Sequence, residues 1–122
     1  MDEKVNLAQK LSSFQETWVP KVVGELNDQL VKVAKLQGEY VWHRHEHEDE
    51  MFLVLSGRLR ILLPDREVVL EQGEFFIVPR GTEHKPVAED LVEAMLFEPA
   101  TTRNTGDVDH DHTIEPEGLE RI

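Results

Sequence analysis

Histidines are concentrated in one short segment of this chain. Three of the six lie at alternate positions, His43, His45 and His47, within the polar sequence WHRHEHEDE. Residues 39–45 are predicted to form a strand, so His43 and His45 would point to the same face of it. Two imidazoles that face one way provide half of the ligands that a transition-metal ion needs.

Two further side chains are placed to complete such a site. Glu50 lies beyond a short polar turn, at the start of the next predicted strand, and its carboxylate reaches the same point if that strand folds back antiparallel. His84 comes 34 residues after Glu50 and follows the turn Pro79-Arg80-Gly81, so a hairpin can bring it to the same centre. Three neutral imidazoles and one carboxylate suit Mn, Fe, Co, Ni, Cu or Zn better than Mg or Ca.

The residues alone leave other interpretations open. An acidic, histidine-rich turn can simply be solvated. His45 and His47 form a second His-x-His pattern, with a tighter turn before Glu50. If His43 and His45 are the pair, His47 is a spare side chain that lies beside the site or in solvent. The sequence DHDH at 109–112 could hold a metal adventitiously, although a solvated segment is the simpler interpretation.

The elements that must position these groups follow from alternating hydrophobicity, which from residue 29 onward has a period of two. Many short strands separated by glycine and proline predict an all-β sandwich or barrel. We divide the chain into an N-terminal helical segment (1–20), a β-barrel domain (21–99) and an acidic tail (100–122), which we expect to be poorly packed. The expected elements are a short helix over 5–14 and strands over 30–38, 39–45, 51–56, 59–63, 67–71, 75–78 and 91–97.

Composition and charge narrow the classes of partner. The chain has 122 residues, with 13 Lys and Arg against 25 Asp and Glu, a formal net charge of −12. That charge opposes binding to nucleic acid and to an anionic membrane surface. The longest apolar run, 51–55, is far short of a membrane span, and the first residues show no apolar signal core. With no cysteine for disulfides or thiolate ligands, we expect a cytoplasmic, single-domain protein.

The residues that frame the histidines resemble the first motif of the cupin superfamily. That motif places Gly several residues before His-x-His, then three or four residues, Glu, six residues and a second Gly. Here these positions are Gly38, His43, His45, Glu50 and Gly57, with four residues before Glu50 and six after it. The sequence departs from the pattern in having four residues between Gly38 and His43, where five are usual.

The second cupin motif is also present. It reads Gly, five residues, Pro-x-Gly, two residues, His, three residues, Asn, and it matches Gly73, Pro79-Arg80-Gly81 and His84. The final Asn is replaced by Ala88, a position that is not a ligand in cupins. A spacer of 15 residues separates the two motifs, as in small prokaryotic cupins.

The resemblance covers residues 38–88 closely. It implies a double-stranded β-helix, the jelly-roll barrel of cupins. In that fold His43, His45, Glu50 and His84 would bind one divalent transition metal, with Mn, Fe, Ni, Co and Zn as the candidates. Small cupins of this type are often homodimers, so a homodimer is the expected assembly.

The faces of the predicted strands suggest a pocket and an interface. Val41, Phe52 and Val54 share the face of the ligands and are the candidate pocket residues. The opposite face of the 51–56 strand is equally apolar, so we expect a second subunit to cover it.

A metal with open coordination positions can act as a Lewis acid or, if it is iron, support oxygen chemistry. Cupins include dioxygenases, isomerases and lyases. We therefore expect a mononuclear-metal enzyme acting on a small oxygenated metabolite, anionic or chelating, with the reaction unassigned. The alternative is a non-catalytic cupin module that binds or senses a small molecule or sugar. The sequence contains no Ser-His-Asp set, phosphate loop or nucleotide fingerprint.

Overall fold

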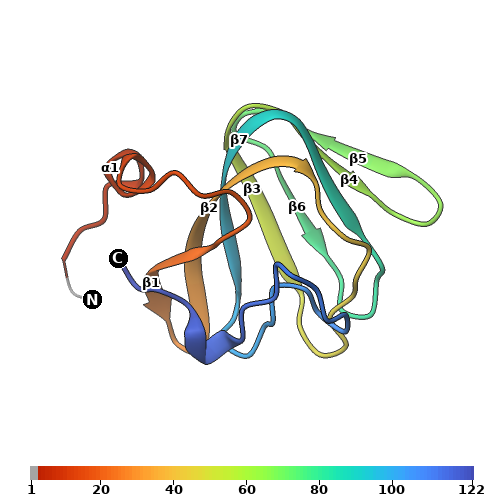
Figure 1. The fold of residues 1–122 in the computed structure, drawn as a ribbon. Coiled ribbons are helices and arrows are strands. Elements are labelled where there is room, and N and C mark those ends of the chain that lie inside the picture. Colours follow the sequence, from red (N-terminus) through yellow and green to blue (C-terminus); the bar gives the residue numbers. More distant parts are fainter. Residues whose placement is uncertain (1–2) are drawn as a thin grey trace.

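Strands dominate the computed structural model, which describes residues 3–122 of the chain. A short helix precedes them and an irregular segment follows (Figure 1). The elements are α1 (Leu7–Ser12), β1 (Lys21–Leu26), β2 (Gln29–Glu39), β3 (Glu50–Ser56), β4 (Leu59–Leu62), β5 (Glu67–Leu70), β6 (Phe75–Val78), β7 (Lys85–Pro99) and the 3-10 helix η1 (Pro116–Gly118). No helix within residues 3–122 is long and apolar enough to cross a membrane.

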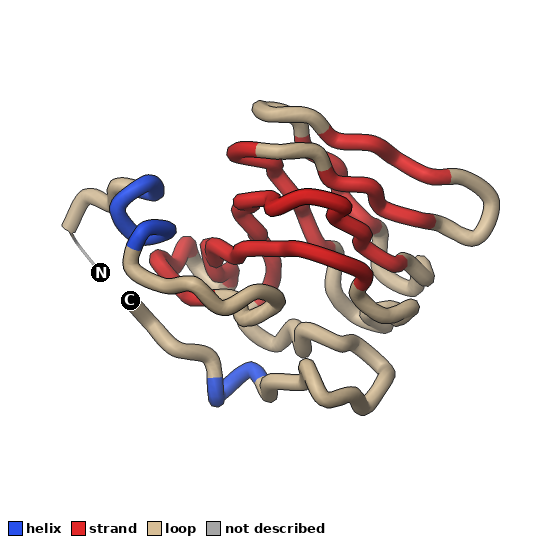
Figure 2. Tube along the Cα trace, turned by 45° about the horizontal axis from the view of Figure 1, so that its top comes forward, coloured by secondary structure: helices blue, strands red, loops and turns tan. Residues whose placement is uncertain are grey.

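The long strand β7 joins the two halves of the fold. Its C-terminal part pairs with β2 on one side and β3 on the other, whereas its N-terminal part pairs with β4 and the end of β2. All of these pairings are antiparallel, and the register shifts between Leu36 and Gly38 in β2. Such irregularities bend strands, so one sheet in the order β1-β2-β7-β3-β6, with β4 and β5 beside β7, curls into the predicted jelly-roll barrel (Figures 1 and 2).

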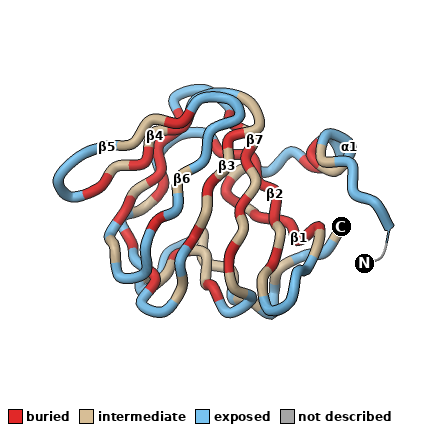
Figure 3. The backbone as a smooth tube through the Cα atoms, turned by 180° about the vertical axis from the view of Figure 1, so that it is seen from behind, coloured by how far each residue is buried: buried red, intermediate tan, exposed pale blue. Residues whose placement is uncertain are grey.

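Alternation along the central strands defines the interior of the barrel. Buried and half-buried residues follow one another through β3 and the second half of β7 (Figure 3). The inward positions are apolar except near the open end of the barrel, where charged residues replace them. The main buried cluster contains Trp18, Ala34, Leu36, Tyr40, Phe52, Val54, Leu59, Ile61, Leu63, Leu70, Val78, Ala88, Val92, Ala94 and Leu96.

A second apolar cluster lies outside the barrel, between α1 and the outer face of β2. It contains Leu11, Phe14, Val23 and Val33. The helix begins after Asn6, whose side-chain Oδ1 accepts a hydrogen bond from the backbone N–H of Gln9 at 3.0 Å, an N-cap. The expected N-terminal helix is therefore confirmed, and its buried face covers part of the sheet.

Two local expectations were wrong. Residues 39–45 do not form a separate strand: β2 runs on to Glu39, and the chain then leaves the sheet up to Glu50, with one isolated bridge at His43. The segment after residue 99 is irregular and acidic as expected, but it is not poorly packed. Thr102 and Thr105 are wholly buried, because this segment packs against the backbone of 40–49, which has few sheet partners of its own.

Candidate metal centre

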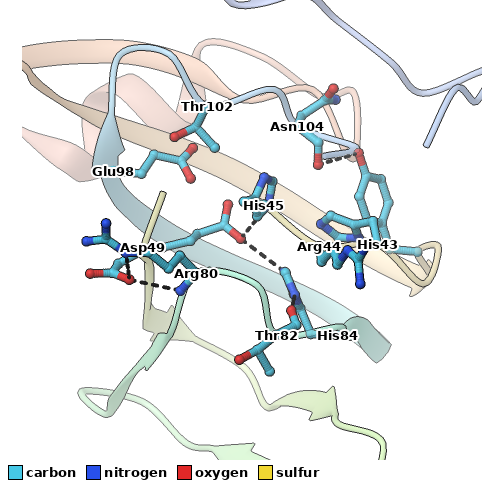
Figure 4. Close-up of polar contacts among 12 residues, drawn as sticks. His43, Arg44, His45, Asp49, Arg80, Thr82, His84, Glu98, Thr102 and Asn104 are labelled. Atoms are coloured by element: carbon cyan, nitrogen blue, oxygen red, sulfur yellow. Dashed lines mark hydrogen bonds and ion pairs between the residues drawn. The ribbon is translucent and has the colours of Figure 1, made fainter. Parts of the chain in front are cut away.

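The four predicted ligands meet at one end of the barrel. His43 and His45 lie between β2 and β3, Glu50 is the first residue of β3, and His84 immediately precedes β7. All four are buried, and one ligand atom from each lies within 4.8 Å of the others. Figure 4 shows the three histidines directed toward a common point. Residues separated by as many as 41 positions in the sequence, His43 and His84, are thus brought together by the fold.

Backbone hydrogen bonds hold the histidines in place. His43 N–H donates to the His84 carbonyl at 3.1 Å, and His84 N–H donates to the His43 carbonyl at 2.9 Å. The carbonyl of His45 accepts a hydrogen bond from Gly81 N–H at 2.7 Å. Gly81 has a φ of +77°, which glycine adopts readily. The turn before His84 therefore fixes the His-x-His segment as well.

Two of the rings are oriented by the carbonyl two residues before them. The Nδ1 of His43 lies 2.9 Å from the Val41 carbonyl oxygen, and that of His84 lies 3.0 Å from the Thr82 carbonyl oxygen. Because a carbonyl can only accept, these contacts assign the ring proton to Nδ1 and leave Nε2 unprotonated. Histidine ligands of metals are oriented in this way.

The donor atoms face one another in a way that favours a cation between them. Nε2 of His84 lies 3.2 Å from Oε1 of Glu50, and Nε2 of His45 lies 3.3 Å from the same oxygen. Within residues 3–122, neither ring nitrogen of His45 has a hydrogen-bond partner although the side chain is buried. Buried polar atoms without partners are rare in proteins. A metal ion with ligand distances of about 2.0–2.2 Å would satisfy Nε2 of His45, the nitrogen that faces Glu50, so the residues fit a metal.

The electrostatics hold His43 and Glu50 in the forms that bind metal, whereas in the metal-free protein they favour a proton on His45. Burial, assisted by nearby His84, lowers the pKa of His43 from 6.5 to about 4, so this ring is neutral at neutral pH. Burial acts to raise the pKa of Glu50, but its polar contacts with the side chains of Glu98, His45 and His84 hold it well below 4.5. Burial acts to lower the pKa of His45, but the Glu50 carboxylate raises it above 6.5.

A mostly apolar cavity of about 30 Å³ adjoins the centre. Of the predicted pocket residues, Phe52 lines it, whereas Val54 is enclosed in the core and Val41 packs against that core without lining the cavity. His47 is exposed and lies outside the four-residue group. The cavity is lined by Trp18, Pro20, Ala34, Leu36, Tyr40, His43, Glu50, Phe52, Pro86, Leu96, Glu98 and Asn104.

Sequence reasoning missed a buried ion pair beside the centre. Lys32 Nζ lies 2.7 Å from Oε1 of Glu98, and both side chains are at most 2% exposed. Burial and the adjacent Glu50 carboxylate raise the pKa of Glu98. The available signal was the register of β7: Val92, Ala94 and Leu96 alternate into the interior, so the next inward position is 98.

A curled antiparallel barrel with three histidines and a glutamate converging at one end is the architecture of a cupin. The sequence pattern of the Cupin_2 family, described as "Cupin domain", matches residues 29–98, which is more than half of the chain. The protein therefore belongs to the Cupin_2 family.

Similar proteins and structures agree with this assignment. A cupin-2 domain containing protein from Shewanella frigidimarina NCIMB 400 is 41% identical, with a TM-score of 0.77 over 78% of this chain and 93% of that one. Protein NMB1881 from Neisseria meningitidis is 28% identical, with a TM-score of 0.73 over 80% of this chain and 99% of that one. The uncharacterised protein YdbB of Bacillus subtilis strain 168 is 36% identical over 86 residues, which are 70% of this chain and 76% of that protein.

Proposed function

We propose that this cupin is a metalloenzyme with one divalent transition metal bound by His43, His45, Glu50 and His84. The observation that carries the proposal is the buried His45 ring, whose two nitrogens lack hydrogen-bond partners while a carboxylate oxygen lies 3.3 Å from one of them. Mn, Fe, Co, Ni and Zn all accept this set of three nitrogens and one oxygen.

The substrate we propose is a small oxygenated metabolite that is anionic or chelating. Three neutral imidazoles, one carboxylate and a divalent ion carry a net charge of +1, which favours an anionic ligand in a mostly apolar cavity. When bound, the metal would supply Lewis-acid polarisation of the ligand, or oxygen chemistry if it is iron. Phe52 and Leu96 line the cavity with apolar surface, and the stacked rings of Trp18 and Tyr40, with centroids 4.6 Å apart, line it as well.

The cavity is also lined by an acidic side chain, Glu98, that is not a proposed ligand of the metal. Glu98, paired with buried Lys32, offers an oxygen that has no hydrogen-bond partner. We propose that a bound metabolite occupies the cavity, between the carboxyl group of Glu98 and the metal. The reaction class remains within the dioxygenase, isomerase and lyase types.

The second candidate is a cupin module that binds or senses a small molecule without converting it. The described residues that line the cavity include no serine, threonine, cysteine or lysine, so this alternative is favoured over an enzyme that forms a covalent intermediate through one of these side chains. We also propose that the protein is a cytoplasmic homodimer.

A depletion assay separates the two candidates. Metal-loaded protein and the variant His84→Ala are incubated with a panel of small hydroxy-, keto- and sugar acids, and proton NMR follows each compound over time. An enzyme consumes a compound only when His84 is present. Saturable binding of a compound, with none in the panel depleted, would favour the binding module instead.

A further inference from the structure

The segment that carries two of the proposed ligands is held by few strand contacts. Residues 40–49 lie outside the named strands. His43 is fixed by its bridge to His84, and the carbonyl of His45 is fixed by Gly81 N–H. Arg44, between the two histidines, has its backbone polar groups directed the other way, because successive residues of an extended chain alternate. Its partners determine whether the two rings keep their relative orientation.

Those partners come from the C-terminal segment. Arg44 N–H donates to Oδ1 of Asp107 at 3.0 Å, and Asp107 N–H donates to the Arg44 carbonyl at 3.1 Å. This reciprocal pair satisfies both backbone groups of Arg44 with a single residue. Asp107 lies beyond residues 29–98, where the family pattern matches.

The preceding glycine allows this close approach. Gly106 has a φ of +57°, and a Cβ placed on it would lie 2.2 Å from the Arg44 carbonyl oxygen. The same Cβ would lie 3.2 Å from Cδ2 of the His43 ring. Any larger residue would therefore push on the backbone between the histidines and on one of the rings.

The turn that contains Gly106 and Asp107 has its own supports. The guanidinium of Arg103 donates to the carbonyls of Gly106 and Val108 at 3.1 and 3.2 Å. Thr105 is wholly buried, and its Oγ1 donates to the Val108 carbonyl at 2.7 Å. The turn can therefore hold Arg44 without depending on the metal.

We propose that Gly106 and Asp107 are positioning residues of the metal centre. They hold the Arg44 backbone from the side opposite to His84, so that the rings of His43 and His45 converge before the ion arrives. The inference rests on the proposed metal site and adds the C-terminal segment to it.

Cobalt binding tests this role, with Co²⁺ alone as the probe. Affinity is measured by calorimetry and the visible spectrum of bound Co²⁺ is recorded for wild type, Asp107→Ala, Asp107→Asn and Asp111→Ala. We expect Asp107→Ala to weaken binding about 10- to 100-fold, as loss of supporting contacts does at other metal sites, and to change the Co²⁺ spectrum. Asp107→Asn keeps an acceptor oxygen for Arg44 N–H, so this variant should retain most of the wild-type Co²⁺ affinity and a spectrum close to that of wild type. Asp111, exposed on the same segment, is the matched control and should have no effect.

A second measurement makes no use of metal. In the metal-free protein, Asp107→Ala and Gly106→Ala should accelerate hydrogen exchange at the Arg44 amide and shift the ring signals of His43 in NMR spectra, while circular dichroism verifies the fold. Wild-type affinity and spectrum in Asp107→Ala would overturn the inference. Absence of Co²⁺ binding by wild type, with the Arg44 and His43 effects present, would instead overturn the proposed function and leave the positioning of the two histidines established.

Discussion

His43 and His84 are joined by two backbone hydrogen bonds, and their ring centroids lie 4.2 Å apart. Each ring also contacts the carbonyl two residues before it. The pair is thus fixed twice, through the backbone and through Nδ1, before any ion is bound. Pre-organisation of this kind raises affinity because less conformational freedom is lost on binding.

The low pKa of His43 predicts acid sensitivity of the metal-free protein. The pKa of His43 is about 4 in the folded protein, where the ring is buried, and 6.5 in the unfolded chain, where it is not. Between these values the unfolded chain binds more protons, so the free energy of unfolding should fall by about 3 kcal/mol as pH drops from 6.5 to 4. Urea denaturation in the presence of a chelator measures this.

The variant His43→Gln isolates that contribution, since glutamine does not titrate while Glu50 and His45 still do. Its free energy of unfolding should lose less between pH 6.5 and 4 than that of wild type. Equal losses in the two proteins would show that His43 is not the group responsible.

The buried pair of Lys32 and Glu98 predicts an asymmetric response to mutation. Lys32→Met leaves a buried carboxyl group without its partner, and we expect a loss of about 3 kcal/mol, the low end of the usual range because Glu98 can take up a proton. The double variant with Met at 32 and Leu at 98 removes both charges and should recover most of that stability. Urea denaturation at pH 7 is the measurement, and a double variant as unstable as the single one would refute the expectation.

The outer face of β6 predicts the site of dimerisation. Phe75 and Ile77 are 59% and 48% exposed, and they pair in register with Leu53 and Met51 of β3. Light scattering should find a dimer for wild type and a monomer for Ile77→Lys, because a buried lysine in the interface would lack a partner.

Leu91 supplies the matched control, since it is exposed to a similar extent, 46%, but lies in β7, which does not pair with β6, between the residues paired with β3 and those paired with β4. Leu91→Lys should remain a dimer. A monomeric wild-type protein at high concentration would rule out the proposed assembly.

The candidate ligands could be predicted because their chemistry is carried by residue type and spacing. Few residues bind transition metals, and His43, His45, Glu50 and His84 occur at cupin intervals. The barrel followed from short alternating strands. The exact path of 40–49 could not be predicted, because a His-x-His alternation suits a strand and an extended loop equally well.

The buried polar groups were harder to predict because a sequence does not identify which face of a strand turns inward. In β2, Val31 and Val33 point outward and Lys32 inward, the reverse of the usual pattern. Likewise, the acidic composition of residues 100–122 suggested a solvated segment, but Thr102 and Thr105 are buried. The carboxylate of Asp107 accepts a hydrogen bond from Arg44 N–H, a contact that composition does not reveal.

Metal content tests directly whether His43, His45, Glu50 and His84 bind a metal ion. Tag-free wild type, His84→Ala and His47→Ala are loaded with metal, dialysed and measured by inductively coupled plasma mass spectrometry. We expect about one first-row transition metal per chain in wild type and in His47→Ala, and its loss in His84→Ala, whose missing imidazole removes one of the four ligands. Sub-stoichiometric metal in wild type, or equal contents in wild type and His84→Ala, would contradict this expectation.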